Sequence, residues 1–113
     1  MNREEFIKAM KEAPDELDSE WVANVVVNNR NTSGHTRLLY IAIEELAELA
    51  KELTKELRGI GDRTAVLEEF ADVQIILDHL QIVFNFTFEE TQKAQYVKFK
   101  RIEDKIKTDG VYH

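Results

Sequence analysis

The chain has 113 residues, of which 43% are hydrophobic, and it contains one proline and no cysteine. This length and composition are typical of one soluble domain with its own core, and the missing cysteines exclude disulfides and thiolate metal sites. The formal net charge of -7 argues against duplex nucleic acid as a partner, because phosphate contacts require a basic surface.

The chain shows no sign of export or membrane insertion. Residues 1–5 lack the apolar core of a signal peptide, and no apolar run approaches the ~18 residues of a membrane span. A cytoplasmic protein without a membrane partner is expected.

The first 35 residues predict a helical extension and a loop. Asn2 and Glu5 have the spacing of a capping box, so a helix is expected from about residue 3 to 12, before Pro14. Residues 15–28 suit either a strand or a helix, and the helix is favoured. Residues 28–35 are rich in Asn, Ser and Gly and predict a loop.

Two longer helices are expected next, at about 36–58 and 65–86. Gly59 is placed to end the first, and Asp62 or Thr64 to cap the second. Apolar residues three and four apart predict one buried face on the first helix: Leu39, Ile43, Leu46, Ala50, Leu53 and Leu57. The second is apolar nearly all round in its later half, which favours self-association.

A last helix is expected at about 87–107, because Thr87 and Glu90 form a capping box. The tail at 108–113 is expected to fray. The sequence thus predicts a single all-α domain over residues 1–113. This domain is expected to be a bundle of four to five helices with an antiparallel central pair, completed by oligomerisation, and residues 36–107 are its core.

Acidic pairs mark both central helices. Glu45 and Glu48 are three apart, as are Glu69 and Asp72, so each pair shares one side of its helix. The short connection between the helices makes them neighbours, about 8–10 Å apart, and the four carboxylates can meet around a cation. Oxygen ligands favour Mg²⁺, with Mn²⁺ as the alternative.

The alternative for such a cluster is a solvated acidic face. Two observations weigh against it. On the first helix, acidic residues stack four apart, as in Glu44 and Glu48, which is unfavourable. On the second, no Lys or Arg occurs between Arg63 and Lys93, so its acids need a partner from another helix or a metal.

This pattern resembles the MazG-like family of all-α nucleoside triphosphate pyrophosphohydrolases, which shows Glu-x-x-Glu followed by Glu-x-x-Asp. Here the motifs are Glu45-x-x-Glu48 and Glu69-x-x-Asp72, separated by twenty residues. The resemblance covers about residues 36–107. It implies Mg²⁺-dependent hydrolysis of a (deoxy)nucleoside triphosphate to the monophosphate and pyrophosphate, by a dimer or tetramer.

The resemblance also implies roles for individual residues. Glu45, Glu48, Glu69 and Asp72 would bind the metal, and a nearby glutamate would act as general base toward the attacking water. Glu44, Glu45 and Glu48 are the catalytic candidates, and Glu52 or Glu68 are further acids that could assist. Lys98, Arg101 and Lys105 share one side of the last helix and are candidates for binding phosphate, or else form a solvated basic face.

Two other functions remain open from the sequence. Phosphoribosyl-ATP pyrophosphohydrolase shares this architecture and acidic chemistry. A non-catalytic helical interaction or regulatory module, with its acids paired by another subunit, is the alternative of a different class.

Overall fold

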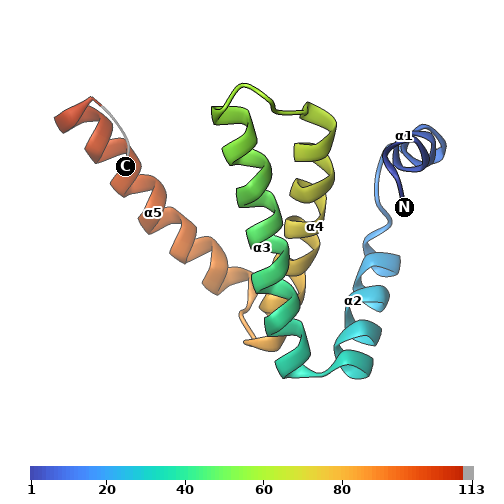
Figure 1. Ribbon diagram of the computed structural model, residues 1–113. Coiled ribbons are helices and arrows are strands. Elements are labelled where there is room, and N and C mark those ends of the chain that lie inside the picture. Colours follow the sequence, from blue (N-terminus) through green and yellow to red (C-terminus); the bar gives the residue numbers. More distant parts are fainter. Residues whose placement is uncertain (111–113) are drawn as a thin grey trace. The chain divides into compact units, whose positions relative to one another are not determined.

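The computed structural model describes residues 1–110, and every regular element in this range is an α-helix (Figure 1). The five helices are α1 (Arg3–Glu12), α2 (Ser19–Ser33), α3 (His35–Leu57), α4 (Arg63–Val83) and α5 (Phe88–Asp109). The all-α prediction is confirmed. Among residues 1–110, no helix combines the length and apolar character needed to cross a membrane.

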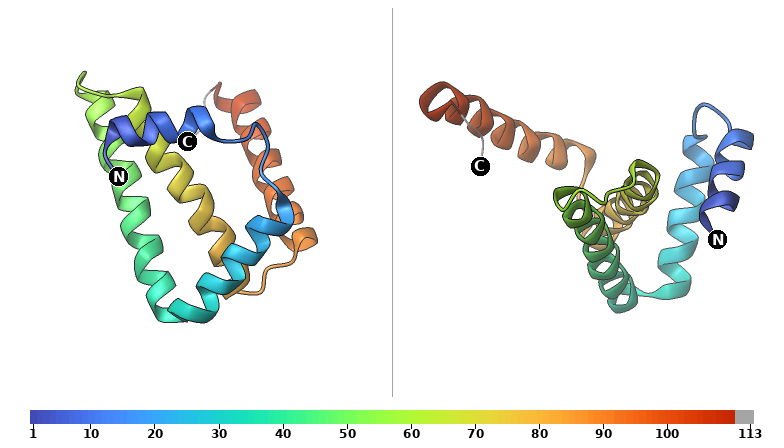
Figure 2. Two further views of the ribbon diagram at one scale, coloured as in Figure 1. Left: turned by 90° about the vertical axis from the view of Figure 1, so that its right-hand side faces the viewer. Right: turned by 45° about the horizontal axis from the view of Figure 1, so that its top comes forward.

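The chain divides into two compact units. Residues 1–83 form the first unit, with α1 to α4, and the second unit begins at Phe84 and contains α5. In the first unit α3 and α4 lie side by side along their length (Figures 1 and 2), and α2 packs against both. In the second unit the rings of Phe84 and Phe86 stack with centroids 5.6 Å apart, just before α5.

Helix ends follow the signals in the sequence. The Asn2 side chain accepts a hydrogen bond from the Glu5 amide, and Thr87 and Glu90 form a complete capping box. Gly59 adopts a positive φ of 76° after α3, a conformation that costs glycine little. These local contacts explain why most helix limits fall within two or three residues of the prediction.

The loop expected at residues 28–35 is wrong. α2 continues to Ser33, and Gly34 alone separates it from α3. The polar side chains of Asn29 and Ser33, residue types that favour loops, form hydrogen bonds within α2 and with α4. The Ser33 hydroxyl donates to Asn29 Oδ1 at 2.9 Å, and Asn29 in turn contacts His79 of α4.

The face of α3 that the pattern predicts to be buried is largely exposed. Ile43, Leu46, Leu53 and Leu57 are between 46% and 88% exposed. The face that packs inward is instead rotated by about one residue, or roughly 100°, and contains Leu38 and Ala42. On α3 the buried residues are therefore Leu38, Ala42 and Glu52, and the most apolar stripe of this helix is largely exposed.

The later half of α4 is also only partly covered. Val73, Ile76 and Val83 are buried, whereas Ile75 and Leu77 are each 53% exposed. The predicted end of the last helix near residue 107 is two residues short of its observed end at Asp109. The tail at residues 108–113 is expected to fray. Residues 108 and 109 are instead helical, and residues 111–113 lie outside the described range.

Candidate metal centre

The candidate centre lies where α3 and α4 face each other. Glu45 follows Leu38 and Ala42 on the inward stripe of α3, so helical periodicity directs it toward α4. Glu69 and Asp72 are three residues apart on α4 and therefore project from the same side. Glu45 and Glu69 are both half-buried.

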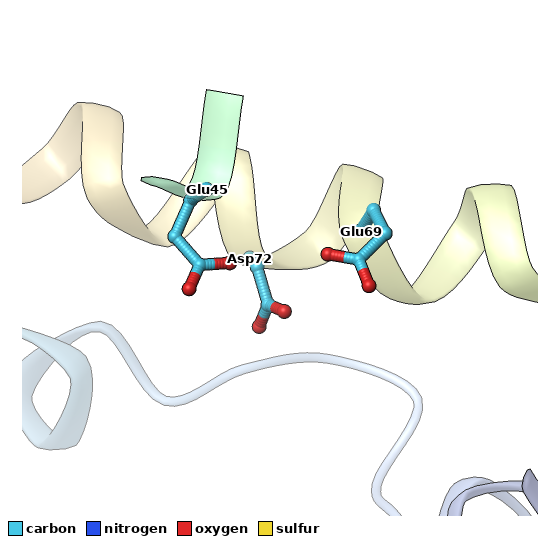
Figure 3. Close-up of side chains that lie close together, drawn as sticks. All are labelled: Glu45, Glu69 and Asp72. Carbon is cyan, nitrogen blue, oxygen red and sulfur yellow. The ribbon is translucent and has the colours of Figure 1, made fainter. Parts of the chain in front are cut away.

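These three carboxylates converge. One oxygen from each of Glu45, Glu69 and Asp72 can be chosen so that all three lie within 4.8 Å of one another. Figure 3 shows the Glu45 carboxylate beside Asp72, with Glu69 further along α4. Carboxylate oxygens are the donors that a hard divalent cation such as Mg²⁺ would take, and these three residues are the ones that would hold it.

Burial and neighbouring carboxyl groups shift the pKa values of Glu45 and Asp72. Desolvation raises the pKa of the Glu45 carboxyl, and the charge of Asp72 raises it further. Desolvation also raises the pKa of Asp72, while its hydrogen bond with Glu45 lowers it. The hydrogen bond between these two carboxyl groups therefore shifts their pKa values in opposite directions, upward for Glu45 and downward for Asp72.

The pKa of Glu69 is raised as well. Burial raises the pKa of its carboxyl first, and the charges of Asp72 and Glu48 add to the shift. Every charge that acts on Glu69 is another carboxylate, and this is the environment that a divalent cation relieves.

The fourth predicted ligand, Glu48, is not among the three converging carboxylates. Its side chain is exposed, although its charge raises the pKa of both Glu45 and Glu69. Glu44 is directed elsewhere: it is exposed and lines an open groove at the start of α3 with Arg37 and Tyr40.

Glu52 is buried, which the sequence does not predict. It is 9% exposed, on the inward face of α3, and its charge contributes to the raised pKa of Glu69. Lys55 lies 3.2 Å from its Oε1 atom and compensates part of this buried charge. A position seven residues after Glu45, two turns along the same face, is the signal in the sequence that could have identified it.

Arg3 is a second residue whose role the sequence does not indicate. Its guanidinium contacts Glu68 of α4 at 2.6 Å and lies 3.9 Å from Asp62. The expectation that an acid of α4 takes a cation from another helix is met at Glu68, next to the cluster. No local signal in residues 1–12 indicates this contact, because it joins residues 65 apart in the chain.

The basic candidates belong to the second unit. Lys98, Arg101 and Lys105 are all exposed on α5, and Lys105 pairs with Asp109 at 3.1 Å. They share a helix side as expected, and their role in binding phosphate remains a prediction.

Comparison of the chain with protein families, with curated proteins and with solved structures finds no match. The resemblance to MazG-like enzymes therefore rests on the acidic motifs and on their arrangement.

Proposed function

We propose that this protein is a MazG-like, Mg²⁺-dependent nucleoside triphosphate pyrophosphohydrolase that converts a (deoxy)nucleoside triphosphate to the monophosphate and pyrophosphate. The observation that carries the proposal is the convergence of Glu45, Glu69 and Asp72 from two helices. Three of the four ligands that the motifs name lie in one cluster, although the motifs are twenty residues apart in the chain.

The proposal assigns each acid a task. Bound Mg²⁺ supplies a positive charge for the phosphates and acidifies water. Glu45, Glu69 and Asp72 are assigned as the ligands that would hold the cation. Glu48 is exposed beside the cluster, where it can complete the ligand set or accept the proton of the attacking water.

Other parts of the proposal concern the assembly. The central helices α3 and α4 form an antiparallel pair, and the chain self-associates as a dimer or tetramer. Apolar side chains left exposed on α3 and α4 support this association. Lys98, Arg101 and Lys105 are assigned to substrate phosphates that the cation does not neutralise.

Product analysis tests the activity. The protein is incubated with Mg²⁺ and each nucleoside triphosphate in turn, including dUTP and dCTP, and monophosphate and pyrophosphate are quantified. Glu45→Gln and Asp72→Asn are expected to lower kcat/KM by more than about 100-fold, beyond the loss typical of outer-shell changes around a metal.

Matched controls lie on the same two helices. Glu56→Gln on α3 and Asp78→Asn on α4 neutralise exposed acids outside the cluster and should retain activity. Full activity in Glu45→Gln and Asp72→Asn contradicts the assignment of the ligands. If no nucleoside triphosphate is cleaved, phosphoribosyl-ATP is tested in the same assay, and its cleavage would replace the proposed substrate.

A further inference from the structure

A groove of about 670 Å³ lies where α2 turns into α3 (Figure 1). Its lining extends from Ser33, the last residue of α2, to Glu44 on α3, and both helices belong to the first unit. Sites for small molecules have volumes of about 300–1,000 Å³. The groove is therefore large enough to hold a base and a sugar.

Three residues that line the groove share one side of α3. Arg37, Tyr40 and Glu44 follow one another at intervals of three and four positions, so Tyr40 lies between a guanidinium and a carboxylate. Tyr40 is 66% exposed, and an exposed aromatic ring is a surface on which a planar base can stack. This side of α3 thus combines a stacking surface with a hydrogen-bond donor at one end and an acceptor at the other.

The two charged residues of the groove have no ionic partner in the described part of the chain. Among residues 1–110, neither Arg37 nor Glu44 belongs to an ion pair. Both are exposed, so a ligand in the groove can reach them. A ligand that offers acceptors to Arg37 and donors to Glu44 satisfies both without breaking an existing ion pair.

The groove leads toward the candidate metal centre. Ile41, which lines it, is one helical turn before Glu45 and so shares a side of α3 with this proposed ligand. Tyr40 is five residues before Glu45, a step of about 7.5 Å along the helix axis. A base stacked on Tyr40 would therefore leave room for a sugar before the phosphates reach the centre.

We infer that this groove binds the base of the nucleotide and that the base is guanine. The inference rests on the proposed function for the class of its ligand and adds to it a site and a base. Tyr40 stacks on the base, Arg37 donates to its acceptors, and Glu44 accepts from its N–H groups.

The hydrogen-bonding edges of guanine match this pair of side chains. Its N1–H and N2–H₂ groups are adjacent donors, which suit the two oxygens of the Glu44 carboxylate. Its O6 and N7 atoms are adjacent acceptors, which suit a guanidinium such as that of Arg37. Guanine can therefore make a paired contact with each residue.

The other bases match Glu44 less well. In uracil and thymine, the single ring N–H lies between two carbonyl oxygens, which repel a carboxylate. Cytosine and adenine each offer one amine, and the ring nitrogen beside it is an acceptor that also repels a carboxylate. Each good paired contact discriminates against the wrong base, so a preference of about tenfold for guanine is expected.

Binding of nucleoside monophosphates in EDTA tests the groove without hydrolysis. The ¹⁵N-labelled full-length protein is titrated with GMP, AMP, CMP and UMP, and its backbone amides are followed by NMR. GMP should shift the amides of residues 33–44, with a Kd about tenfold below that of each other nucleotide. Shifts confined to other residues, or equal Kd values for all four nucleotides, contradict the inference.

Two variants separate stacking from base reading. Tyr40→Leu should weaken the binding of all four nucleotides, because stacking is available to every base. Glu44→Gln should raise the Kd for GMP about tenfold and leave that for UMP unchanged, because an amide has only one acceptor oxygen. Tyr96→Leu on α5, at a residue that is also 66% exposed, and Glu56→Gln on α3 are the matched controls and should bind as the original protein does.

Hydrolysis in Mg²⁺ distinguishes failure of this inference from failure of the proposed function. GTP and dGTP should have the highest kcat/KM, and Glu44→Gln should remove that preference. An equal loss for every base in Glu44→Gln contradicts the inference, because Glu44 would then act on the phosphates. Equal kcat/KM for all bases also overturns the groove assignment but leaves the proposed function standing. GMP bound at residues 33–44 of a protein that hydrolyses no triphosphate supports the groove and overturns the proposed function.

Discussion

The carboxyls of Glu45, Glu69 and Asp72 are held in an arrangement that disfavours their charged forms. Burial is the largest cause of the raised pKa at each of the three residues. Shifted pKa values are common among residues of functional sites, because binding and catalysis often require like-charged groups to lie close together and away from water.

Without a divalent cation, the three raised pKa values set the direction of the pH dependence. The folded state binds protons more tightly than the unfolded state, so their contribution to the free energy of unfolding is greatest below the ordinary carboxyl range. It declines as the pH rises from that range through the raised pKa values of the folded state. Thermal melts in EDTA from pH 4 to 8 should show this decline.

Neutralising Glu69 should remove part of the repulsion. In EDTA at pH 7, Glu69→Gln is expected to stabilise the fold by roughly 0.5 kcal/mol, the size of typical like-charge contacts. Added Mg²⁺ should raise the melting temperature of the original protein more than that of Glu69→Gln. Asp78→Asn is the control, and an equal response to Mg²⁺ in all three proteins would contradict a cation at Glu69.

Arg3 stabilises α4 beside the cluster. Arg3→Gln breaks the ion pair with Glu68, which is partly exposed at both residues, and should cost about 0.5–1 kcal/mol. A double-mutant cycle with Glu68→Gln measures the coupling, and 1 M salt should reduce it. Lys8→Gln on the same helix is the control; zero coupling in the cycle would show that the contact contributes nothing.

At the scale of elements, a hydrogen bond between the side chains of Asn29 and His79 links α2 to α4. His79 is 3% exposed; its Nδ1 lies 2.8 Å from the Ile75 carbonyl and its Nε2 2.9 Å from the Asn29 amide nitrogen. Since a carbonyl only accepts, Nδ1 carries the proton and Nε2 accepts from Asn29. Both ring nitrogens of this buried side chain therefore have a hydrogen-bond partner.

Removing the donor should be costly. Asn29→Ala leaves the buried Nε2 atom of His79 without its partner and should lower the free energy of unfolding by about 1–3 kcal/mol. Asn31→Ala changes an exposed residue of the same helix and serves as the control. Chemical denaturation measures both, and equal stability of the two variants would show that the contact is unimportant.

The elements also show what the sequence could and could not predict. Caps such as Thr87 with Glu90 are local, so their residue types are sufficient to locate a helix start. The apolar stripe through Leu46 and Leu53 follows the helical repeat that the spacing predicts, but the described residues of the first unit leave it largely exposed. Within residues 28–33, Asn29 contacts His79, fifty positions later in the chain, and no local pattern predicts such a contact.

The candidate site likewise has features that the sequence predicts and features that it leaves open. Spacing along each helix indicated which acids share a side, and the short connection indicated that the helices meet. The distance between facing carboxylates depends on the rotation of α3 about its axis, which periodicity leaves open. That rotation brings Glu45 to Asp72, leaves Glu48 outside the cluster and buries Glu52.

At the scale of the molecule, a small core and an exposed apolar surface occur together. Leu38 is the one large side chain fully buried within the described residues, and the buried residues of α3 and α4 include Ala42, Ala65 and the polar His79. A core this small gives a small free energy of unfolding, and the repulsion among the clustered carboxylates lowers it further. Association of chains and binding of a cation would each stabilise the folded state by mass action.

Direct cation binding tests the central claim that Glu45, Glu69 and Asp72 form a metal site. Mn²⁺ is titrated into the protein alone, and free Mn²⁺ is followed by electron paramagnetic resonance. Saturable binding to the original protein and to Asp78→Asn, reduced at least tenfold in Glu69→Gln and Asp72→Asn, is the predicted result. Equal binding by all four proteins, or no binding by any, would contradict it.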